Sequence, residues 1–281
     1  MWRVLRRIAL GLSLTAGVLA MWSVWWEPSS LTVTEHPLQL DWPSTRGPRI
    51  AVLTDLHVGS PFNDLDRLRE IVRRTNAARP DVICILGDLV IQGVRGGTFV
   101  PPEEIGEVLG DLKAPSGVFA VLGNHDGWLD HDRVERALVR NHVRIVEDTA
   151  VRIGTGASGW WLAGISDLWT GRHDITAAMA AAKDDGSPVI LMTHNPDVFP
   201  GVPPRVALTL AGHTHGGQVR LPLIGRPIVP SAFGQRFAAG HIVEGGRHLY
   251  VATGVGTSII PVRLGVRPAV PVISIVPVAR Q

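Results

Sequence analysis

The stretch Ile50-Ala51-Val52-Leu53-Thr54-Asp55-Leu56-His57 joins four apolar residues to a polar turn that holds a carboxylate and an imidazole. The apolar run predicts a buried strand, and the polar residues begin where that strand ends. Because residues two apart on an extended segment share a face, Asp55 and His57 can reach one metal ion. This pair alone is weak evidence, since a surface turn can have the same sequence.

Four more polar blocks follow apolar runs in the same way. The runs predict strands at residues 82–86, 118–122, 189–192 and 206–210. The blocks after them are Gly87-Asp88-Leu89, Gly123-Asn124-His125-Asp126, Thr193-His194-Asn195 and Gly212-His213-Thr214-His215-Gly216. Carboxylate, imidazole and amide oxygen together suit divalent cations such as manganese, iron or zinc. Five strand ends therefore offer ligands to one place, and we expect a metal cluster there.

The order of these blocks resembles the calcineurin-like metallophosphoesterase superfamily, whose pattern is D-x-H, G-D, G-N-H followed by an acidic residue, H, and G-H-x-H. Every block is present in that order, and the resemblance covers residues 49 to about 276. Three further motifs resemble its membrane-associated bacterial branch: Gly216-Gly217-Gln218, Gly254-Val255-Gly256-Thr257 and Arg263-Leu264-Gly265.

The resemblance implies a site with two divalent metal ions, which can be manganese, iron or zinc. The first ion would be bound by Asp55, His57 and His215, the second by Asn124, His194 and His213, and both by Asp88. A water bridging the two ions would lose a proton near neutral pH and attack the phosphorus in line. By the same resemblance His125 is the catalytic residue, which would stabilise the phosphoryl oxygens or protonate the leaving alkoxide.

Several residues near the blocks have two interpretations each. Asp126 can orient His125 or cap the loop by accepting backbone hydrogen bonds. Asp167 follows another apolar run and can support the ligands from behind, although a structural role is favoured. Arg95 can grip a phosphate, although a solvated loop is favoured. Trp128 can line the substrate pocket or pack within the fold.

Histidines outside the blocks and the single cysteine are expected to be structural or surface residues. The histidines are His36, His131, His142, His173, His241 and His248. Cys84 lies inside an apolar run, which predicts a small buried side chain. One cysteine excludes a disulfide within the chain.

The predicted fold is α/β: a two-sheet sandwich of mixed strands flanked by helices, the four-layer arrangement of the resembled superfamily. Apolar spacing predicts a helix over residues 63–79, with Asn63 as its cap and Pro80 as its stop. Other helices are expected at residues 102–112, 132–141 and 174–183. The second half favours mixed or antiparallel strands, at residues 160–165, 189–192, 206–210, 248–253 and 270–276.

The amino terminus predicts a membrane anchor. Residues 8–26 form 19 consecutive uncharged residues, about the length of a bilayer-spanning helix. Arginines precede this run and tryptophans end it: Arg3, Arg6, Arg7, Trp22, Trp25 and Trp26. The positive-inside rule then places the bulk of the chain outside the cytoplasmic membrane. The alternatives are a signal peptide cleaved after Val18-Leu19-Ala20, with secretion, or twin-arginine export.

Three segments follow from this pattern: an anchor at residues 1–26, a linker at 27–48 that can hold an edge strand near 31–40, and a catalytic domain at 49–281. The formal charge of +2 comes mainly from the anchor. Removing residues 1–26 takes away three arginines and leaves 24 basic against 25 acidic side chains, a charge of −1. No nucleic-acid partner is predicted. The sequence gives no prediction of the number of chains in the native assembly.

The predicted activity is a membrane-anchored phosphoesterase that cleaves a phosphodiester, phosphomonoester or pyrophosphate. The anchor favours a lipid or nucleotide-lipid substrate, and the apolar segment 221–229 can be a lipid-facing lip or ordinary loop packing. The alternative is a scaffold of the same fold that binds metals and a protein partner without catalysis. A zinc hydrolase of another fold lacks support, because the chain has no His-Glu-x-x-His motif.

Overall fold

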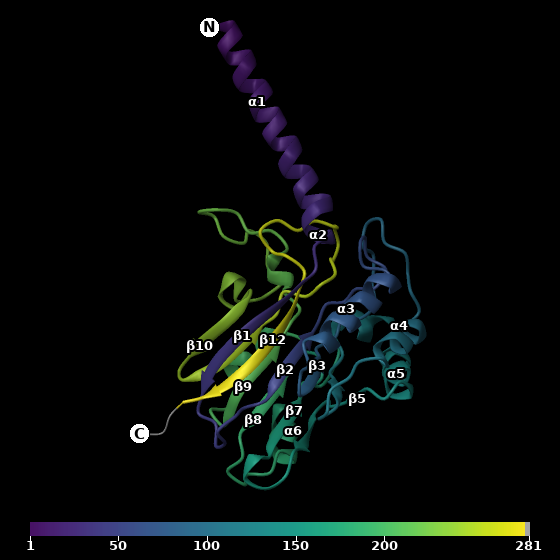
Figure 1. Ribbon diagram of the computed structural model, residues 1–281, viewed down its shortest axis with the longest axis vertical. Helices are drawn as coiled ribbons and strands as arrows, with labels where there is room; N and C mark the ends of the chain where they lie inside the picture. Colours follow the sequence, from purple (N-terminus) through teal and green to yellow (C-terminus); the bar gives the residue numbers. More distant parts are fainter. Residues whose placement is uncertain (279–281) are drawn as a thin grey trace.

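The computed structural model describes residues 1–278, in which two six-stranded sheets stack between outer helices (Figure 1). In order across the first sheet, the strands are β1 (Thr32–Leu40), β12 (Ala269–Pro277), β2 (Arg49–Leu53), β3 (Val82–Ile85), β4 (Val118–Ala120) and β5 (Arg144–Ile145). Strands β2 to β5 run parallel, and β12 is antiparallel to β2. This mixed sheet carries the first three polar blocks.

The second sheet is also mixed. Its strands, in order, are β10 (Gly240–Glu244), β11 (Arg247–Val251), β9 (Val206–Ala211), β8 (Val189–Met192), β7 (Trp160–Gly164) and β6 (Thr149–Ile153). The four central strands run parallel, and the two edge strands are antiparallel to their neighbours. The last two polar blocks follow β8 and β9.

Apolar side chains fill the space between the sheets and the space under the helices. Val52 and Cys84 from the first sheet meet Ile190 and Leu208 from the second, and all four are buried. Strands buried on both faces need near-continuous apolar sequence, which explains the unbroken apolar runs of β2, β3 and β8. The α/β sandwich predicted from the sequence is therefore confirmed.

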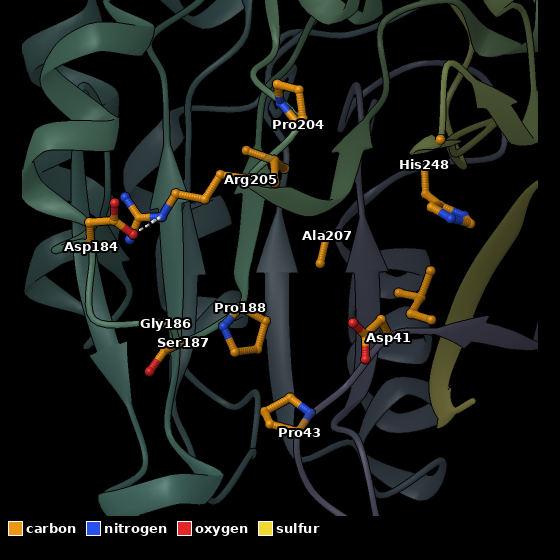
Figure 2. A pocket seen from close by; sticks show the side chains of 13 residues that line it. Asp41, Pro43, Asp184, Gly186, Ser187, Pro188, Pro204, Arg205, Ala207 and His248 are labelled. Atoms are coloured by element: carbon orange, nitrogen blue, oxygen red, sulfur yellow. Dashed lines mark ion pairs between the residues drawn. The ribbon is translucent and has the colours of Figure 1, made fainter. Parts of the chain in front are cut away.

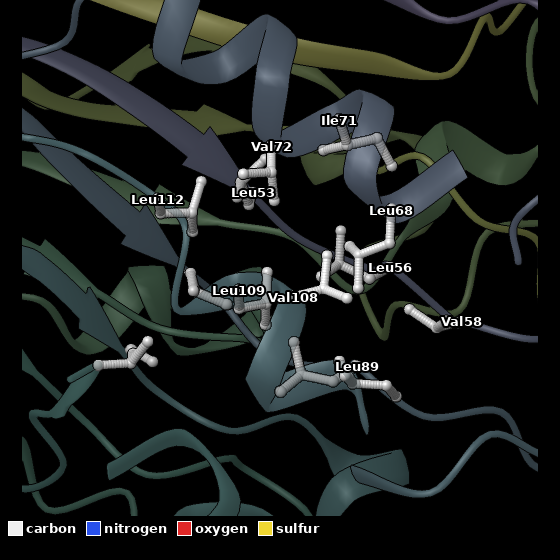
Figure 3. Close-up of a cluster of buried hydrophobic side chains, with 14 of the residues drawn as sticks. Leu53, Leu56, Val58, Leu68, Ile71, Val72, Leu89, Val108, Leu109 and Leu112 are labelled. Carbon is white, nitrogen blue, oxygen red and sulfur yellow. The ribbon is translucent and has the colours of Figure 1, made fainter. Parts of the chain in front are cut away.

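Helices cover the outer face of each sheet. The first sheet is covered by α3 (Leu65–Ala77), α4 (Pro102–Leu109) and α5 (Asn124–Arg140), and the second by α6 (Ile175–Ala181) with the 3-10 turn Pro196–Gly201. Figure 3 shows Leu68 and Ile71 of α3 packing with Leu109 of α4 over the strand residue Leu53. The four layers are thus helices, sheet, sheet and helices.

Two predicted helix starts were wrong. Asp64, not Asn63, caps α3, because its side chain accepts a hydrogen bond from Arg67 N at 2.9 Å. The helix expected at residues 132–141 begins earlier, at Asn124, so that a predicted metal ligand stands in its first turn. Asp130 has an extended backbone (φ 179°) that divides this helix, and the predicted segment is the part after the break.

The expected linker contains a strand of the first sheet. Strand β1 pairs in parallel with β12 from Thr32 to Leu40, close to the edge strand expected at residues 31–40. Leu38, Leu40 and Trp42 are buried in the core between the sheets. Strands β5, β6 and β10 were not predicted.

One apolar helix leaves the domain at its amino terminus (Figure 1). It consists of α1 (Trp2–Met21), the π-helical turn Trp22–Trp26 and α2 (Glu27–Ser29), and it spans 28 residues. By length and composition this helix can cross a membrane, although a signal sequence meets the same criterion. Glu27, at its end, is buried against the domain and accepts a hydrogen bond from Val266 N at 2.5 Å.

Candidate metal centre

All seven side chains predicted as ligands lie together at the carboxyl ends of parallel strands. Strands β2, β3 and β4 of the first sheet and β8 and β9 of the second end at the same edge of the sandwich. Each ligand is at most 5% exposed: Asp55, His57, Asp88, Asn124, His194, His213 and His215. Ligand sites of α/β sheets form at such strand ends, where the loops turn away from the sheet.

The loops that carry these ligands have an unusual backbone. Five of the seven residues have a positive φ, between 40° and 68°: Asp55, His57, Asp88, His213 and His215. Side-chain-bearing residues rarely adopt this left-handed conformation, and each instance costs about 1–2 kcal/mol. Such strain gathers at functional sites, where the surrounding structure holds it in place.

Glycines allow two of these loops to touch. A Cβ atom on Gly87, which has φ +87°, would lie 2.2 Å from Gly123 N. A Cβ atom on Gly123 would lie 2.3 Å from Asp88 Oδ1. Only glycine at both positions lets the loops after β3 and β4 bring Asp88 beside the first turn of α5.

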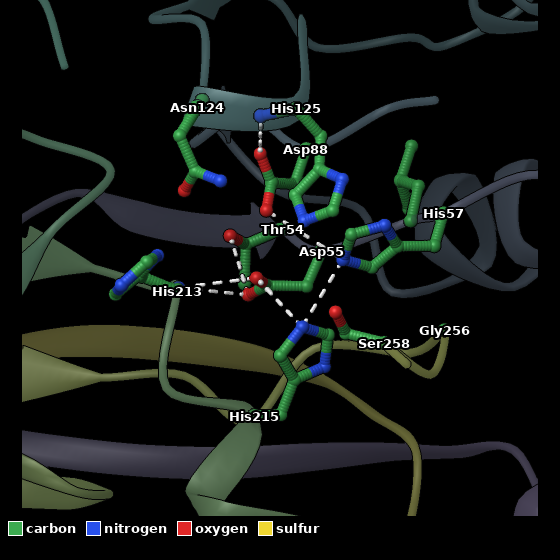
Figure 4. Close-up of polar contacts among 12 residues, drawn as sticks. Thr54, Asp55, His57, Asp88, Asn124, His125, His213, His215, Gly256 and Ser258 are labelled. Carbon is green, nitrogen blue, oxygen red and sulfur yellow. Dashed lines mark hydrogen bonds and ion pairs between the residues drawn. The ribbon is translucent and has the colours of Figure 1, made fainter. Parts of the chain in front are cut away.

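A first group of ligand atoms surrounds Asp55 (Figure 4). Asp55 Oδ1 lies 3.4 Å from His215 Nε2, and the latter lies 3.1 Å from His57 Nε2. His57 Nε2 also lies 3.6 Å from Asp88 Oδ2. Thr54 Oγ1 and the backbone N of His213 donate hydrogen bonds to Asp55 and fix its carboxylate.

A second group shares Asp88 with the first. His194 Nε2 lies 3.3 Å from Asp88 Oδ2, 3.2 Å from Asn124 Oδ1 and 3.1 Å from His213 Nδ1. The backbone N of His125 donates to the other oxygen of Asp88 at 2.9 Å. Asp88 is therefore placed between two sets of ligand atoms, as a bridging carboxylate requires.

Backbone carbonyls fix the orientation of two imidazoles. His57 Nδ1 lies 3.1 Å from Val90 O, and His194 Nδ1 lies 2.7 Å from Leu86 O. Since a carbonyl only accepts, Nδ1 carries a proton in each ring. The neutral His57 ring therefore turns the lone pair of Nε2 toward Asp88, and the His194 ring does so once its Nε2 has lost its proton. Lone pairs and carboxylate oxygens that converge in this way repel one another unless a cation lies between them. The donor set fits divalent metal ions.

Burial controls the protonation of the cluster. It lowers the pKa of His57 to about 4 and that of His213 to about 3, so both rings are neutral, the form that binds metals. Burial raises the pKa of Asp55 to about 7. His194 is the exception: burial lowers its pKa, but Asp88 raises it to about 10. A cation between Asp88 and His194 would replace the proton that they share.

His125 stands apart from both groups and faces the same cavity. Its ring crosses the His57 ring edge-on at a centroid distance of 4.8 Å, and it lies 5.1 Å from the Trp128 ring. Its Nδ1 is buried and has no hydrogen-bond partner within the part of the chain that the structure describes. His125 therefore lines the cavity without a side-chain hydrogen bond to any other described residue.

Asp126 caps the loops, which is one of the two roles expected for it. Its Oδ1 accepts from Leu89 N and Val90 N at 2.9 and 3.3 Å, and its Oδ2 accepts from Gly123 N at 3.0 Å. It thereby holds the loop of Asp88 against the start of α5.

The cavity above the ligands is largely apolar. It measures about 340 Å³, and its lining includes Trp128, Trp169, Ile228, Ser258 and Ile259 in addition to ligand residues. Trp128 was expected to line the pocket or to pack within the fold, and the segment of Ile228 was expected to be a lipid-facing lip or ordinary loop packing. Trp169, Ser258 and Ile259 were not predicted. Ser258 and Ile259 directly follow the Gly254-Val255-Gly256-Thr257 motif, which was the available signal for their loop, whereas Trp169 follows no recognised motif.

Asp167 and Arg95 lie outside the cavity lining. Asp167 accepts hydrogen bonds from Trp169 N and Thr170 N at 2.8 and 3.0 Å, so it shapes the loop that places Trp169 against His213. Arg95 is exposed, and its backbone N donates to Ile259 O at 3.0 Å.

A second pocket, of about 330 Å³, lies at the opposite end of the second sheet (Figure 2). Its walls include Asp184 and Pro188 before β8, Arg205 before β9, and His248 in β11. None of its lining residues belongs to the five polar blocks. This pocket is therefore separate from the cluster of predicted ligands.

The chain is similar to known phosphoesterases. The model of the calcineurin-like phosphoesterase family matches residues 48–217, which include all seven predicted ligands. The chain is 30% identical to the phosphodiesterase YaeI of Escherichia coli, over 89% of this chain and 90% of that protein. It is also 30% identical to a transmembrane protein with metallophosphoesterase domain from Danio rerio, over 93% of this chain and 61% of that protein.

A solved structure has the same fold. The NAD nucleotidase of Haemophilus influenzae superposes with a TM-score of 0.50 at 12% identity, over 74% of this chain and 45% of that one. At this identity the similarity concerns the fold alone.

Proposed function

This chain belongs to the calcineurin-like phosphoesterase family, and from that premise we propose that it is a membrane-anchored phosphoesterase with two divalent metal ions. The observation that carries the proposal is Asp88, whose carboxylate lies between two groups of buried ligand atoms. Two cations close together need such a bridging anion.

Each ion would have its own side chains in addition to Asp88. The first would be held by Asp55, His57 and His215, and the second by Asn124, His194 and His213. When bound, the ions would supply Lewis-acid charge to the phosphoryl group and lower the pKa of water enough to make it a nucleophile at neutral pH. Oxygen and imidazole ligands suit manganese, iron or zinc, and we propose manganese as the first metal to test.

His125 would be the catalytic residue that contacts the substrate. It lines the cavity, and its backbone N–H already fixes Asp88 through a 2.9 Å hydrogen bond. Its imidazole would donate to a phosphoryl oxygen or to the leaving oxygen as the ester bond breaks. Such proton transfer contributes roughly 10² to 10⁴ in rate.

The substrate would carry an apolar or aromatic group next to its phosphoester. Trp128 and Trp169 stack at a centroid distance of 6.0 Å on one side of the cavity, and Ile228 and Ile259 also line it. Walls of this kind exclude water from the reacting phosphate and favour a lipid or nucleotide-lipid substrate over a free sugar phosphate.

The apolar helix would hold the domain on the outer side of the cytoplasmic membrane. This orientation is supported by the three arginines that precede the helix and by the absence of lysine or arginine between residues 8 and 45. Amino-terminal sequencing of the mature protein tests the alternative, a cleaved signal and a secreted enzyme. A sequence that begins after residue 20 would contradict the anchor.

The proposed activity is tested with the full chain in detergent, loaded with manganese, acting on bis(p-nitrophenyl) phosphate. Asp88→Asn should lower the rate by more than about 10²-fold, because several kcal/mol of Lewis-acid stabilisation is lost. Asp66→Asn, an exposed carboxylate of α3, is the matched control and should leave the rate unchanged. Equal rates for wild type and Asp88→Asn would sink the proposal, and metal binding without turnover would support the scaffold alternative.

A further inference from the structure

Two loops and the end of the amino-terminal helix form one connected surface above the cavity. The backbone N of Arg263 donates to Ser23 O at 2.9 Å, and Val266 N donates to Glu27 Oε1 at 2.5 Å. Ser23, Glu27 and Arg263 are buried at this junction. The helix is therefore fixed to the loop of residues 254–268, which also borders the metal ligands.

The loop of residues 218–230 joins the same surface. Gln218 Nε2 donates to Ser258 O and Ile260 O at 3.2 and 3.3 Å, and Arg220 N donates to Leu264 O at 2.7 Å. Figure 1 shows this loop and the loop of residues 254–268 at the end of the domain from which α1 departs. Both loops thus lie beside the base of the helix.

The tips of these loops expose large aliphatic side chains, which we call the rim. The rim residues are between 48% and 108% exposed: Leu223, Ile224, Ile228, Ile259 and Ile260. A soluble surface rarely gathers exposed apolar side chains of this size, and such patches mark a binding face. The helix, which is joined to the loop of residues 254–268 at Ser23, adds exposed tryptophans at Trp22, Trp25 and Trp26.

The charge of the two loops narrows the kind of partner. Residues 218–230 and 254–268 contain Arg220, Arg226, Arg263 and Arg267 and no aspartate or glutamate. Arg220 and Arg267 are exposed. Exposed aliphatic tips with arginines and no acidic residue fit the headgroup and upper acyl region of an anionic phospholipid leaflet.

We propose that the rim inserts into the lipid leaflet from which the amino-terminal helix emerges. The domain then has a fixed orientation, because the helix and the rim contact the same leaflet and the junction at Arg263 joins them. Ile228 and Ile259 belong both to the rim and to the cavity lining, so the cavity opens at the lipid surface. A phosphoester in a lipid headgroup reaches the metal ligands there without leaving the leaflet. This inference rests on the anchor included in the proposed function.

Depth measurements with single-cysteine variants test the rim. The one native cysteine, Cys84, is fully buried and does not compete for a thiol-reactive fluorophore. Leu223→Cys, Ile224→Cys and Ile260→Cys place the label on the rim, outside or at the edge of the cavity. Val139→Cys on α5 and Val243→Cys on β10 are exposed controls away from these loops. The full chain is reconstituted in vesicles of phosphatidylethanolamine and phosphatidylglycerol.

Rim labels should be quenched at least about twofold more by lipids brominated on their acyl chains than the control labels, and they should be shielded from iodide in the buffer. The vesicles are first extracted with carbonate to show that the protein is still anchored. If iodide then quenches the rim labels as strongly as the label on Val139→Cys, the proposed insertion of the rim is wrong, while the anchor is unaffected. Shielding from iodide without bromolipid quenching would also overturn it, because that result indicates a protein contact.

The depth readout is independent of catalysis. Labels on the rim should report the same depth in Asp88→Asn protein, which the proposed function makes inactive. Failure of hydrolysis and failure of membrane contact are thereby separate results. Arg220→Gln should weaken the bromolipid quenching in vesicles that contain phosphatidylglycerol and leave it unchanged in pure phosphatidylcholine, and an equal effect in both would contradict the role of charge.

Discussion

Replacing Asp126 with asparagine should destabilise the loop that presents Asp88. The Asp126 carboxylate is fully buried, and every hydrogen bond that it makes in the described structure comes from a backbone N–H group. An asparagine can turn its carbonyl oxygen toward Leu89 and Val90. Its NH₂ group then faces Gly123 N–H, where the carboxylate accepted a bond at 3.0 Å.

The expected loss follows from the bonds that change. Burial raises the pKa of Asp126 to about 7, so the side chain is a charged carboxylate at pH 8.5, where the comparison is made. A hydrogen bond to a charged group contributes about 1.5–3 kcal/mol, and the asparagine loses one such bond and sets two donors against each other. We therefore expect the free energy of unfolding to fall by about 2–3 kcal/mol, which lowers Tm by about 5–10 °C in a chain of this size. Asp126→Ala loses all three bonds and should cost at least about twice as much.

Thermal unfolding followed by circular dichroism in detergent measures this loss. Asp132→Asn, an exposed carboxylate of the same helix, is the control and should change the unfolding free energy by no more than about 0.5 kcal/mol. The capping role is refuted if Asp126→Asn unfolds at the wild-type temperature. A large fall in hydrolysis with unchanged stability would instead indicate that Asp126 acts through His125.

Three other predictions concern the proposed catalytic residue His125, the ion pair of His131 with Glu147, and the proposed metal ions. His125→Asn should slow the cleavage of alkyl phosphodiesters by about 10² to 10⁴-fold. It should slow the cleavage of nitrophenyl esters much less, because nitrophenolate leaves without a proton. An equal loss of rate on both substrates would contradict protonation of the leaving group by His125. A hydrogen bond from His131 to Glu147 at 2.8 Å raises the pKa of His131 to about 9. This pair should stabilise the fold by about 1 kcal/mol, a value reduced because His131 is 39% exposed. The contribution is complete below pH 6.5 and lost as the pH rises through 9, so His131→Gln should lower Tm at pH 6 and leave it nearly unchanged at pH 10. Removal of metal by a chelator should lower Tm, because Asp55 and Asp88 lose their cations, and added manganese should restore it. A Tm that is the same with and without the chelator would argue against bound metal.

The clustering of the seven candidate ligands could be predicted from the sequence, because each stands in a polar block that follows an apolar run. Strands β2, β8 and β9 lie within about one residue of their predicted bounds. Their polar blocks then meet for a topological reason, since parallel strands end at one edge. The spacing of His213 and His215 added a local signal that a surface turn rarely has. The structure adds that the Asp88 carboxylate lies between two groups of candidate ligand atoms.

Other features depend on contacts between distant parts of the chain. The start of α5 was missed because Asp130 interrupts its helical pattern. Strand β10 was missed because its five residues, Gly240–Glu244, include only two apolar side chains, of which Val243 is exposed. Trp169 reaches the cavity only because Asp167 holds its loop. Glu27 stood in an expected linker, yet it is buried against a loop more than 230 residues away.

Counting metal ions per chain against the rate of hydrolysis tests the central claim most directly. The full chain is stripped of metal, titrated with manganese and measured by elemental analysis and by cleavage of bis(p-nitrophenyl) phosphate. We predict two ions per chain at full activity and loss of both metal and rate for Asp88→Asn. His125→Asn should retain two ions, with a small loss of rate on this nitrophenyl ester and a large one on an alkyl phosphodiester measured in parallel. Full activity with one ion, or Asp88→Asn protein that retains two ions and the wild-type rate, would contradict a two-metal site bridged by Asp88.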